Sequence, residues 1–213
     1  MTIERTLDAK QTAIPAISAA TAVGDMARLN AALNEGLDAG LSVSDAKEIL
    51  VQMYAYTGFP RSLNALGELM KVVETRKQRG MTDAPGREPG TVPTGKDLLD
   101  LGTANQTKLS GGAVKGPLFE FAPAIDTFLK AHLFGDIFAR DNLDWKSREL
   151  ATVGALSAIT GVESQLQAHV RISMNIGLTP AALHDAADAL DRGGFPDAAK
   201  RARAAVEKQL ASE

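Results

Sequence analysis

The sequence predicts an all-α protein, and three observations support this expectation. Apolar residues recur at helical spacing through most of the chain, whereas the alternation of apolar and polar residues typical of a strand is nowhere sustained. Aromatic residues make up only 5% of the composition, and abundant alanine suits close packing of helices. The chain has 213 residues, which is enough to bury a core in one or two domains.

Three helices are expected in the first part of the chain. Two series of residues at helical spacing mark the first two of them: Met26, Leu29, Leu33 and Leu37, then Ile49, Leu50, Met53 and Thr57. Gly40 ends the first helix, because glycine readily takes the left-handed conformation of a helix C-terminus, and Ser42 or Ser44 caps the next. Gly58 ends the second helix, and a third follows over residues 60–76.

Further helices are expected in the second part of the chain, over residues 121–133, 145–160 and 162–176. Pro180 and Pro196 mark two more helix starts, because the missing N–H of proline has no partner in a first helical turn anyway. His132 lies near the end of its predicted helix, where a partly positive imidazole suits the helix dipole.

The segment between these two parts, residues 79–117, is rich in glycine and proline. One interpretation is a disordered linker, which this composition favours. The other is an ordered loop that folds over a pocket, because long loops in compact domains are often functional. Leu98, Leu99 and Leu101 support the second interpretation weakly, since they can form one short helix.

The two halves resemble each other at an offset of 137 residues. The offset aligns Gly24 with Gly161, Leu29 with Leu166, and Gly40-Leu41-Ser42 with Gly177-Leu178-Thr179. This shared spacing predicts a duplicated helical unit with pseudo-two-fold packing. Two copies are too few for a solenoid, which needs at least three.

Composition excludes several classes of function. The net charge of −3 provides no positive field that would hold nucleic acid. The absence of cysteine excludes a disulfide framework and a thiolate nucleophile, and the presence of only three histidines argues against an all-histidine metal site. No apolar run is long enough to cross a membrane, and the acidic first residues do not resemble a signal peptide, so we expect a cytoplasmic protein.

Two stretches carry a resemblance to a known family: Arg148-Glu149-Leu150-Ala151 with the later Gln165-Leu166-Gln167-Ala168-His169, and Tyr54-Ala55-Tyr56-Thr57-Gly58-Phe59-Pro60 with Arg61. Together with the segment His132 to Asp141, they resemble the carboxymuconolactone decarboxylase family, in its branch of two fused modules. The modules would span residues 1–78 and 118–213, with residues 79–117 connecting them. The interval from Glu149 to His169 is 20 residues, one longer than is usual in the family.

The resemblance implies a helical fold of the alkylhydroperoxidase D type, assembled into rings of modules. The peroxidase branch of the family uses two cysteines, seven and four residues before the histidine, and this chain has Val162 and Gln165 there. Thiol peroxidase chemistry is therefore excluded. The decarboxylase branch lacks these cysteines as well and acts on lactone acids of aromatic compound degradation, without a metal or an organic cofactor.

His169 and Glu149 are the candidate catalytic residues. An imidazole titrates near neutral pH, so it can move a proton to or from a substrate carbon. If the helices over residues 145–160 and 162–176 pack antiparallel, the two residues differ in level by only about 6 Å, and the carboxylate can orient the imidazole. The alternatives are a structural histidine and a glutamate that complements a helix dipole.

A carboxylated substrate also needs an orienting cation and polar contacts. The candidate cations are Arg148, Arg171 and Arg61, because a guanidinium can hold a carboxylate through two hydrogen bonds. Gln165 lies one turn before His169 on the same helix face, and Tyr56 can direct a hydroxyl into a pocket. The alternative for each arginine is a structural or solvated side chain, and for Tyr56 it is a place in the core.

Two function classes therefore remain. The first is a lyase, or a related enzyme without a cofactor, that acts on a small carboxylated lactone or ring compound. The second is a non-catalytic protein that binds a small ligand on the same scaffold. In either case apolar helix faces in a chain of this size predict a homo-oligomer, as a trimer or a pseudo-hexameric ring.

Overall fold

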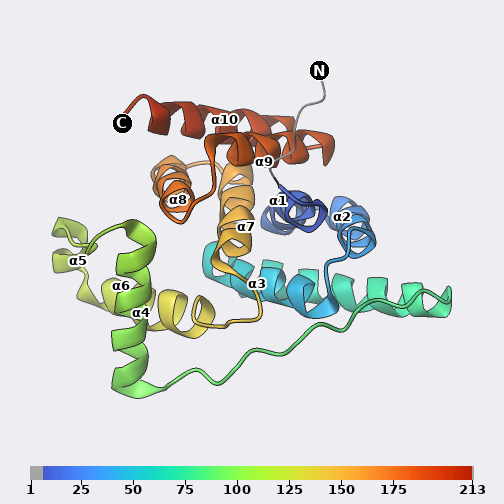
Figure 1. Ribbon diagram of the computed structural model, residues 1–213, viewed down its shortest axis with the longest axis horizontal. Helices are drawn as coiled ribbons and strands as arrows, with labels where there is room; N and C mark the ends of the chain where they lie inside the picture. Colours follow the sequence, from blue (N-terminus) through green and yellow to red (C-terminus); the bar gives the residue numbers. More distant parts are fainter. Residues whose placement is uncertain (1–6, 213) are drawn as a thin grey trace.

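The computed structural model describes residues 7–212, and this part of the chain contains helices and no strand, which confirms the predicted all-α class (Figure 1). Residues 1–6, on which most of the argument against a signal peptide rests, lie outside the described residues. No helix in residues 7–212 is both long and apolar enough to cross a membrane.

The first part of the chain forms α1 (Ala9–Val23), α2 (Met26–Asp38) and α3 (Val43–Gln78). The three expected helices correspond to α2 and to the two parts of α3, and α1 precedes them. Ser42 caps α3, its hydroxyl accepting a hydrogen bond from the Asp45 N–H, as one of the two predicted serines. Gly58, with φ 78° and ψ 161°, interrupts the α3 conformation, so that α3 consists of two arms that meet there.

The middle segment is partly helical. Residues 81–94 have no regular structure and run along one edge of the molecule (Figure 1), and they lead into α4 (Gly95–Ser110). The short helix predicted around Leu98 is therefore confirmed, and it is longer than expected. Gly102 allows α4 to pack closely on the next segment, because a Cβ there would lie 1.8 Å from the carbonyl oxygen of Lys130.

The single helix predicted over residues 121–133 is wrong. The structure has α5 (Pro117–Phe121), α6 (Pro123–Phe128) and a π-helix η1 (Leu129–Ile137). Pro123 explains the first break, because it provides no N–H and restricts Ala122 to a non-helical conformation. His132 consequently lies inside the π-helix and not near the end of an α-helix.

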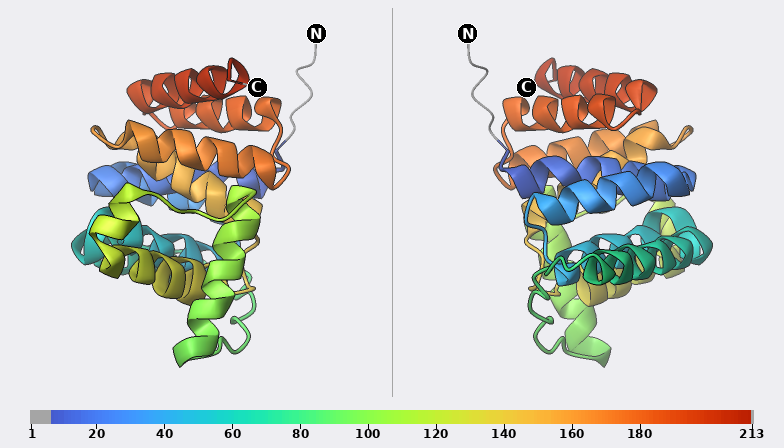
Figure 2. Two further views of the ribbon diagram at one scale, coloured as in Figure 1. Left: turned by 90° about the vertical axis from the view of Figure 1, so that its left-hand side faces the viewer. Right: turned by 90° about the vertical axis from the view of Figure 1, so that its right-hand side faces the viewer.

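Four helices complete the chain: α7 (Trp145–Ala158), α8 (Glu163–Asn175), α9 (Pro180–Arg192) and α10 (Pro196–Leu210). The helices lie in stacked layers, with α9 and α10 at one end and α3 with η1 at the other (Figure 2). Helix α7 runs through the centre and contacts α1, α3, α8, α9 and α10. Its residues are buried continuously from Ser147 to Ser157.

Both halves of the chain contribute to one hydrophobic core. Ile14 and Ile17 of α1 are buried in the same cluster as Leu150 and Val153 of α7. The two helices cross closely because residue 154 is glycine: a Cβ there would lie 2.6 Å from the carbonyl oxygen of Pro15. The predicted duplication stays a prediction, whereas the shared core is plain in the structure.

A buried ion-pair network joins α3 to α7. Glu48, 3% exposed, accepts hydrogen bonds from Arg140 at 2.6 Å and from Arg148 at 3.0 Å. Beside it, Gln52 donates to the Arg148 carbonyl at 2.8 Å and to Thr152 at 2.9 Å. Burial by itself would raise the pKa of Glu48, but the hydrogen bonds and charges of the two arginines outweigh it and hold that pKa below its ordinary value.

Candidate active site

An imidazole and a carboxylate meet between α7 and α8. Nδ1 of His169 lies 2.8 Å from Oε2 of Glu149. Glu149 is completely buried and His169 is 9% exposed. The proximity that was predicted from antiparallel packing of these two helices is therefore present, with the turn at Gly161 (φ 81°) between them.

The hydrogen bond determines which imidazole nitrogen can react. An ionised carboxylate can only accept hydrogen bonds, so Nδ1 of His169 carries a proton and its N–H donates a hydrogen bond to Glu149. Nε2 makes no hydrogen bond with the described residues. It is thus the nitrogen that can exchange a proton with a ligand, while Glu149 maintains the orientation of the ring.

Tyr56, from the first arm of α3, packs against the other side of this imidazole. The ring centroids of Tyr56 and His169 are 5.6 Å apart, and the ring planes meet at 79°. Burial raises the pKa of Tyr56 well above its ordinary value and the charge of Glu149 raises it further, although Thr152 and Arg148 partly offset these effects. The hydroxyl therefore stays protonated at every pH at which the protein would work.

Two polar atoms of this cluster are buried without a hydrogen-bond partner among the described residues: the Tyr56 hydroxyl oxygen and Oε1 of Glu149. An unpaired buried polar atom costs about 1–3 kcal/mol, so native proteins keep few of them outside functional sites. The cluster consequently holds a donor, an acceptor and an imidazole nitrogen close together, which are the groups that recognition of a small polar ligand requires.

The predicted arginines form no hydrogen bond or ion pair with His169, Glu149 or Tyr56 in the described part of the chain, although the charge of Arg148 acts on the pKa of Tyr56. Arg148 is completely buried and its guanidinium is bound by Glu48 and by the Arg140 carbonyl. The Arg61 guanidinium covers Gly24 at the turn between α1 and α2. Arg171 is exposed on α8 and lines a different hollow, with Pro180 among its other lining residues. None of the three makes a hydrogen bond or ion pair with His169 among the described residues.

Gln165 lies one turn before His169, as predicted, and is exposed. Its Oε1 accepts a hydrogen bond from the Ser164 hydroxyl at 2.9 Å. Its position on the helix face of His169 leaves it able to contact a ligand that approaches Nε2 from outside.

A second imidazole–carboxylate pair was not predicted. Nδ1 of His132 lies 2.6 Å from Oδ2 of Asp136 within the π-helix. The His132 ring packs at 5.4 Å from that of Tyr54, which stacks on Phe59 at 4.5 Å. The spacing of four residues between His132 and Asp136 was the available signal, since residues so spaced are neighbours on a helix.

No group of three or more histidine, aspartate and glutamate side chains suited to a metal ion occurs in residues 7–212. The fold and the cluster define an all-α protein with a buried imidazole–carboxylate pair between two consecutive helices, α7 and α8. Residues 123–208 match the model of the carboxymuconolactone decarboxylase family, so the predicted resemblance is confirmed for this part of the chain. No curated protein matches the chain significantly.

The matched region contains Glu149 and His169 but not Tyr56. The aromatic side of the cluster thus comes from a part of the chain that lies outside the match.

Proposed function

We propose that the protein is a cofactor-independent lyase that decarboxylates a small carboxylated lactone or related ring compound. The observation that carries the proposal is the hydrogen bond between His169 and the buried Glu149, which leaves Nε2 of the imidazole available beside the Tyr56 ring. The family match over residues 123–208 supports a decarboxylase more generally.

In the proposed reaction, the bond between the ring carbon and the carboxylate carbon breaks and carbon dioxide leaves. The electron pair of that bond remains on the ring, where it conjugates with the lactone carbonyl. Nε2 of protonated His169 then donates a proton to carbon, and solvent restores that proton. Glu149 stabilises the imidazolium that precedes the transfer.

The other polar groups have positioning roles in this proposal. The Tyr56 hydroxyl, which is protonated and makes no hydrogen bond of good geometry with the described residues, donates a hydrogen bond to a substrate oxygen. Gln165, exposed on the same face of α8 as His169, contacts the outer part of the substrate. Arg148 and Arg61 are not among the proposed substrate contacts, because Arg148 is bound by Glu48 and Arg61 lies at Gly24.

The test is turnover of carboxymuconolactone and related lactone acids, followed by ultraviolet absorbance, in the wild-type protein and two variants. His169→Ala removes the proposed acid. His184→Ala is the matched control, because it removes a partly exposed imidazole that pairs with Glu207 on the surface. We expect turnover in the wild type and in the control, and loss of turnover in His169→Ala.

Equal turnover in all three proteins would place the reaction elsewhere. If the wild type turns over none of the compounds but gains thermal stability from them, the second function class, a protein that binds small ligands, is favoured, since a ligand selective for the folded state stabilises it by mass action.

We also propose that the chain forms a homo-oligomer. The apolar side chains that remain exposed on α3, α5 and α6 support this proposal, because a soluble monomer rarely exposes large contiguous apolar patches.

A further inference from the structure

Most of the exposed large hydrophobic residues in the described part of the chain are gathered in two places. Four lie on the two short helices α5 and α6, on either side of the break at Ala122: Leu118, Phe121, Ile125 and Phe128, with exposures of 65, 89, 44 and 63%. So many large apolar side chains exposed within eleven residues mark a surface that another protein surface can cover. We call these four residues the apolar stripe.

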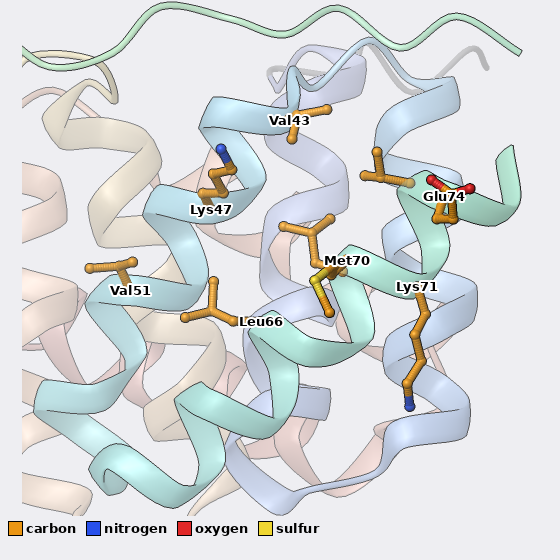
Figure 3. Close-up of a pocket in the computed structure, with 9 residues that line it drawn as sticks. Val43, Lys47, Val51, Leu66, Met70, Lys71 and Glu74 are labelled. Carbon is orange, nitrogen blue, oxygen red and sulfur yellow. The ribbon is translucent and has the colours of Figure 1, made fainter. Parts of the chain in front are cut away.

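The second place is α3. Its two arms enclose a groove of about 840 Å³, lined mainly by apolar side chains (Figure 3). Val43 and Val51 line it from the first arm, and Leu66 and Met70 line it from the second. Met70 is 71% exposed, although it lies on a helix whose other side is buried in the core.

The groove and the apolar stripe have complementary properties. The groove is concave and the stripe projects, with Phe121 almost completely exposed. Lys47 is exposed at the edge of the groove and makes no ion pair among the described residues, while Glu120 is an exposed, likewise unpaired acid beside Phe121. The groove is also lined by Glu74 and by Lys71, which pairs with Glu68. Contact between the stripe and the groove would bury apolar surface, and an orientation with Glu120 beside Lys47 would also bring opposite charges together.

The two surfaces cannot cover each other within one chain. Helices α5 and α6 lie at the front of the left-hand view in Figure 2, and the second arm of α3 lies at the front of the right-hand view, which shows the opposite side of the molecule. A second copy of the chain can satisfy both surfaces, because each copy carries one stripe and one groove.

We propose that the apolar stripe of one copy binds the α3 groove of the next copy. Different surfaces then meet at each contact, so the interface is heterologous and repeats head to tail, as in a closed ring or a filament. This inference rests on the homo-oligomer proposed above and specifies the two surfaces that form it. It does not depend on the proposed reaction.

The test uses three single substitutions and light scattering coupled to size exclusion at micromolar concentration. Phe121→Glu alters the stripe and Met70→Glu alters the groove, both at side chains that are more than two thirds exposed. Leu210→Glu is the control, because it places the same charge at a partly exposed leucine at the end of α10. Thermal unfolding followed by circular dichroism verifies that each variant is folded.

We expect the wild type and Leu210→Glu to be oligomeric and the other two variants to be monomeric. An equimolar mixture of Phe121→Glu and Met70→Glu should form a heterodimer and nothing larger, because one intact stripe can meet one intact groove. That result distinguishes a heterologous contact from one in which two grooves pair.

Three results would overturn the proposal: a monomeric wild type, an oligomer that persists in Phe121→Glu, or a mixture that stays monomeric. A monomeric wild type would mean that the groove accepts a different occupant, such as a small apolar ligand or another protein. Because the mass measurement uses no substrate, failure of this interface and failure of the decarboxylase proposal are seen separately.

Discussion

Tyr56 presents its ring to the imidazole of His169 in an edge-to-face contact, with centroids 5.6 Å apart. The two residues come from opposite halves of the chain, on α3 and α8. The hydrogen bond to Glu149 holds the imidazole from one side, and Tyr56 restricts it from another. The cluster therefore requires the N-terminal helices, even though the family match begins only at residue 123.

The first prediction concerns Glu149→Gln. We expect turnover to fall by about 10- to 100-fold, as is typical when a group that orients a functional imidazole is changed. The uncharged amide no longer favours the proton on Nδ1 of His169. Nitrogen-15 chemical shifts of the imidazole should therefore show a loss of the Nδ1–H tautomer, a readout that needs no substrate.

A purely structural Glu149 would give a different outcome. Stability would fall in Glu149→Gln while the tautomer of His169 stayed as in the wild type. Rescue of the Nδ1–H tautomer by Glu149→Asp is not expected, because the shorter side chain cannot span the 2.8 Å contact without movement of α7.

The second prediction concerns the hydroxyl of Tyr56. Tyr56→Phe should lower turnover with little loss of stability, because the hydroxyl makes no hydrogen bond of good geometry with the described residues, although Thr152 lies near enough to lower its pKa. Urea unfolding should give a free energy of unfolding close to that of the wild type. A drop of more than about 1 kcal/mol would indicate a structural hydrogen bond instead.

The raised pKa of Tyr56 gives this variant a second readout. The chain has only two tyrosines, and the Tyr56 hydroxyl should remain protonated while the protein is folded. The absorbance change at 295 nm on raising the pH to about 11, just above the ordinary tyrosine pKa of about 10, should thus be the same in the folded wild type and in Tyr56→Phe.

Local signals were sufficient to predict most helices and the central pair of the site. Ser42 caps α3 and Gly58 interrupts it through interactions that involve only neighbouring residues. The Glu149–His169 contact could be predicted from the rise per residue of two consecutive helices that were assumed to pack antiparallel. The contact of Tyr56 with His169 could not be obtained this way, because it depends on how distant helices pack.

The arginines that were predicted to contact a substrate show the same limit of prediction from sequence. The sequence presents Arg148 as a free cation beside Glu149, but a residue on α3, Glu48, lies within 3.0 Å and binds it. The π-helix at Leu129–Ile137 was missed because its residues carry an ordinary helical pattern, and the close approach of α4 to it at Gly102 joins segments that are distant in sequence.

The third prediction concerns the ion pairs of Glu48. Glu48→Gln should lower the free energy of unfolding by about 3 kcal/mol at neutral pH, because it leaves the buried Arg148 without its counter-charge. Glu35→Gln, at an exposed carboxylate, is the control and should change it by less than about 0.5 kcal/mol.

This difference should depend on pH in a defined direction. The pKa of Glu48 in the folded protein lies below its ordinary value, so its carboxylate stabilises the fold above the ordinary value of 4.5. That contribution is lost as the pH falls through the lowered pKa. Urea unfolding at a series of pH values should show the wild type and Glu48→Gln converging in acid; a constant difference from pH 7 down to the acid transition would contradict the assignment.

The fourth prediction tests the crossing of α1 and α7 with a matched pair of glycines. In Gly154→Ala the new Cβ would lie 2.6 Å from a backbone oxygen and 2.7 Å from the Cα of Pro15, so the helices must separate. We expect a loss of about 1–3 kcal/mol in the free energy of unfolding.

Gly67, within α3, has no atom within 4 Å of the position that a Cβ would occupy, so Gly67→Ala should stabilise the protein by about 0.5–1 kcal/mol through its higher helix propensity. Because α7 also carries Glu149, Gly154→Ala should weaken turnover as well, whereas equal stability of the two variants would show that α1 and α7 do not depend on this close approach.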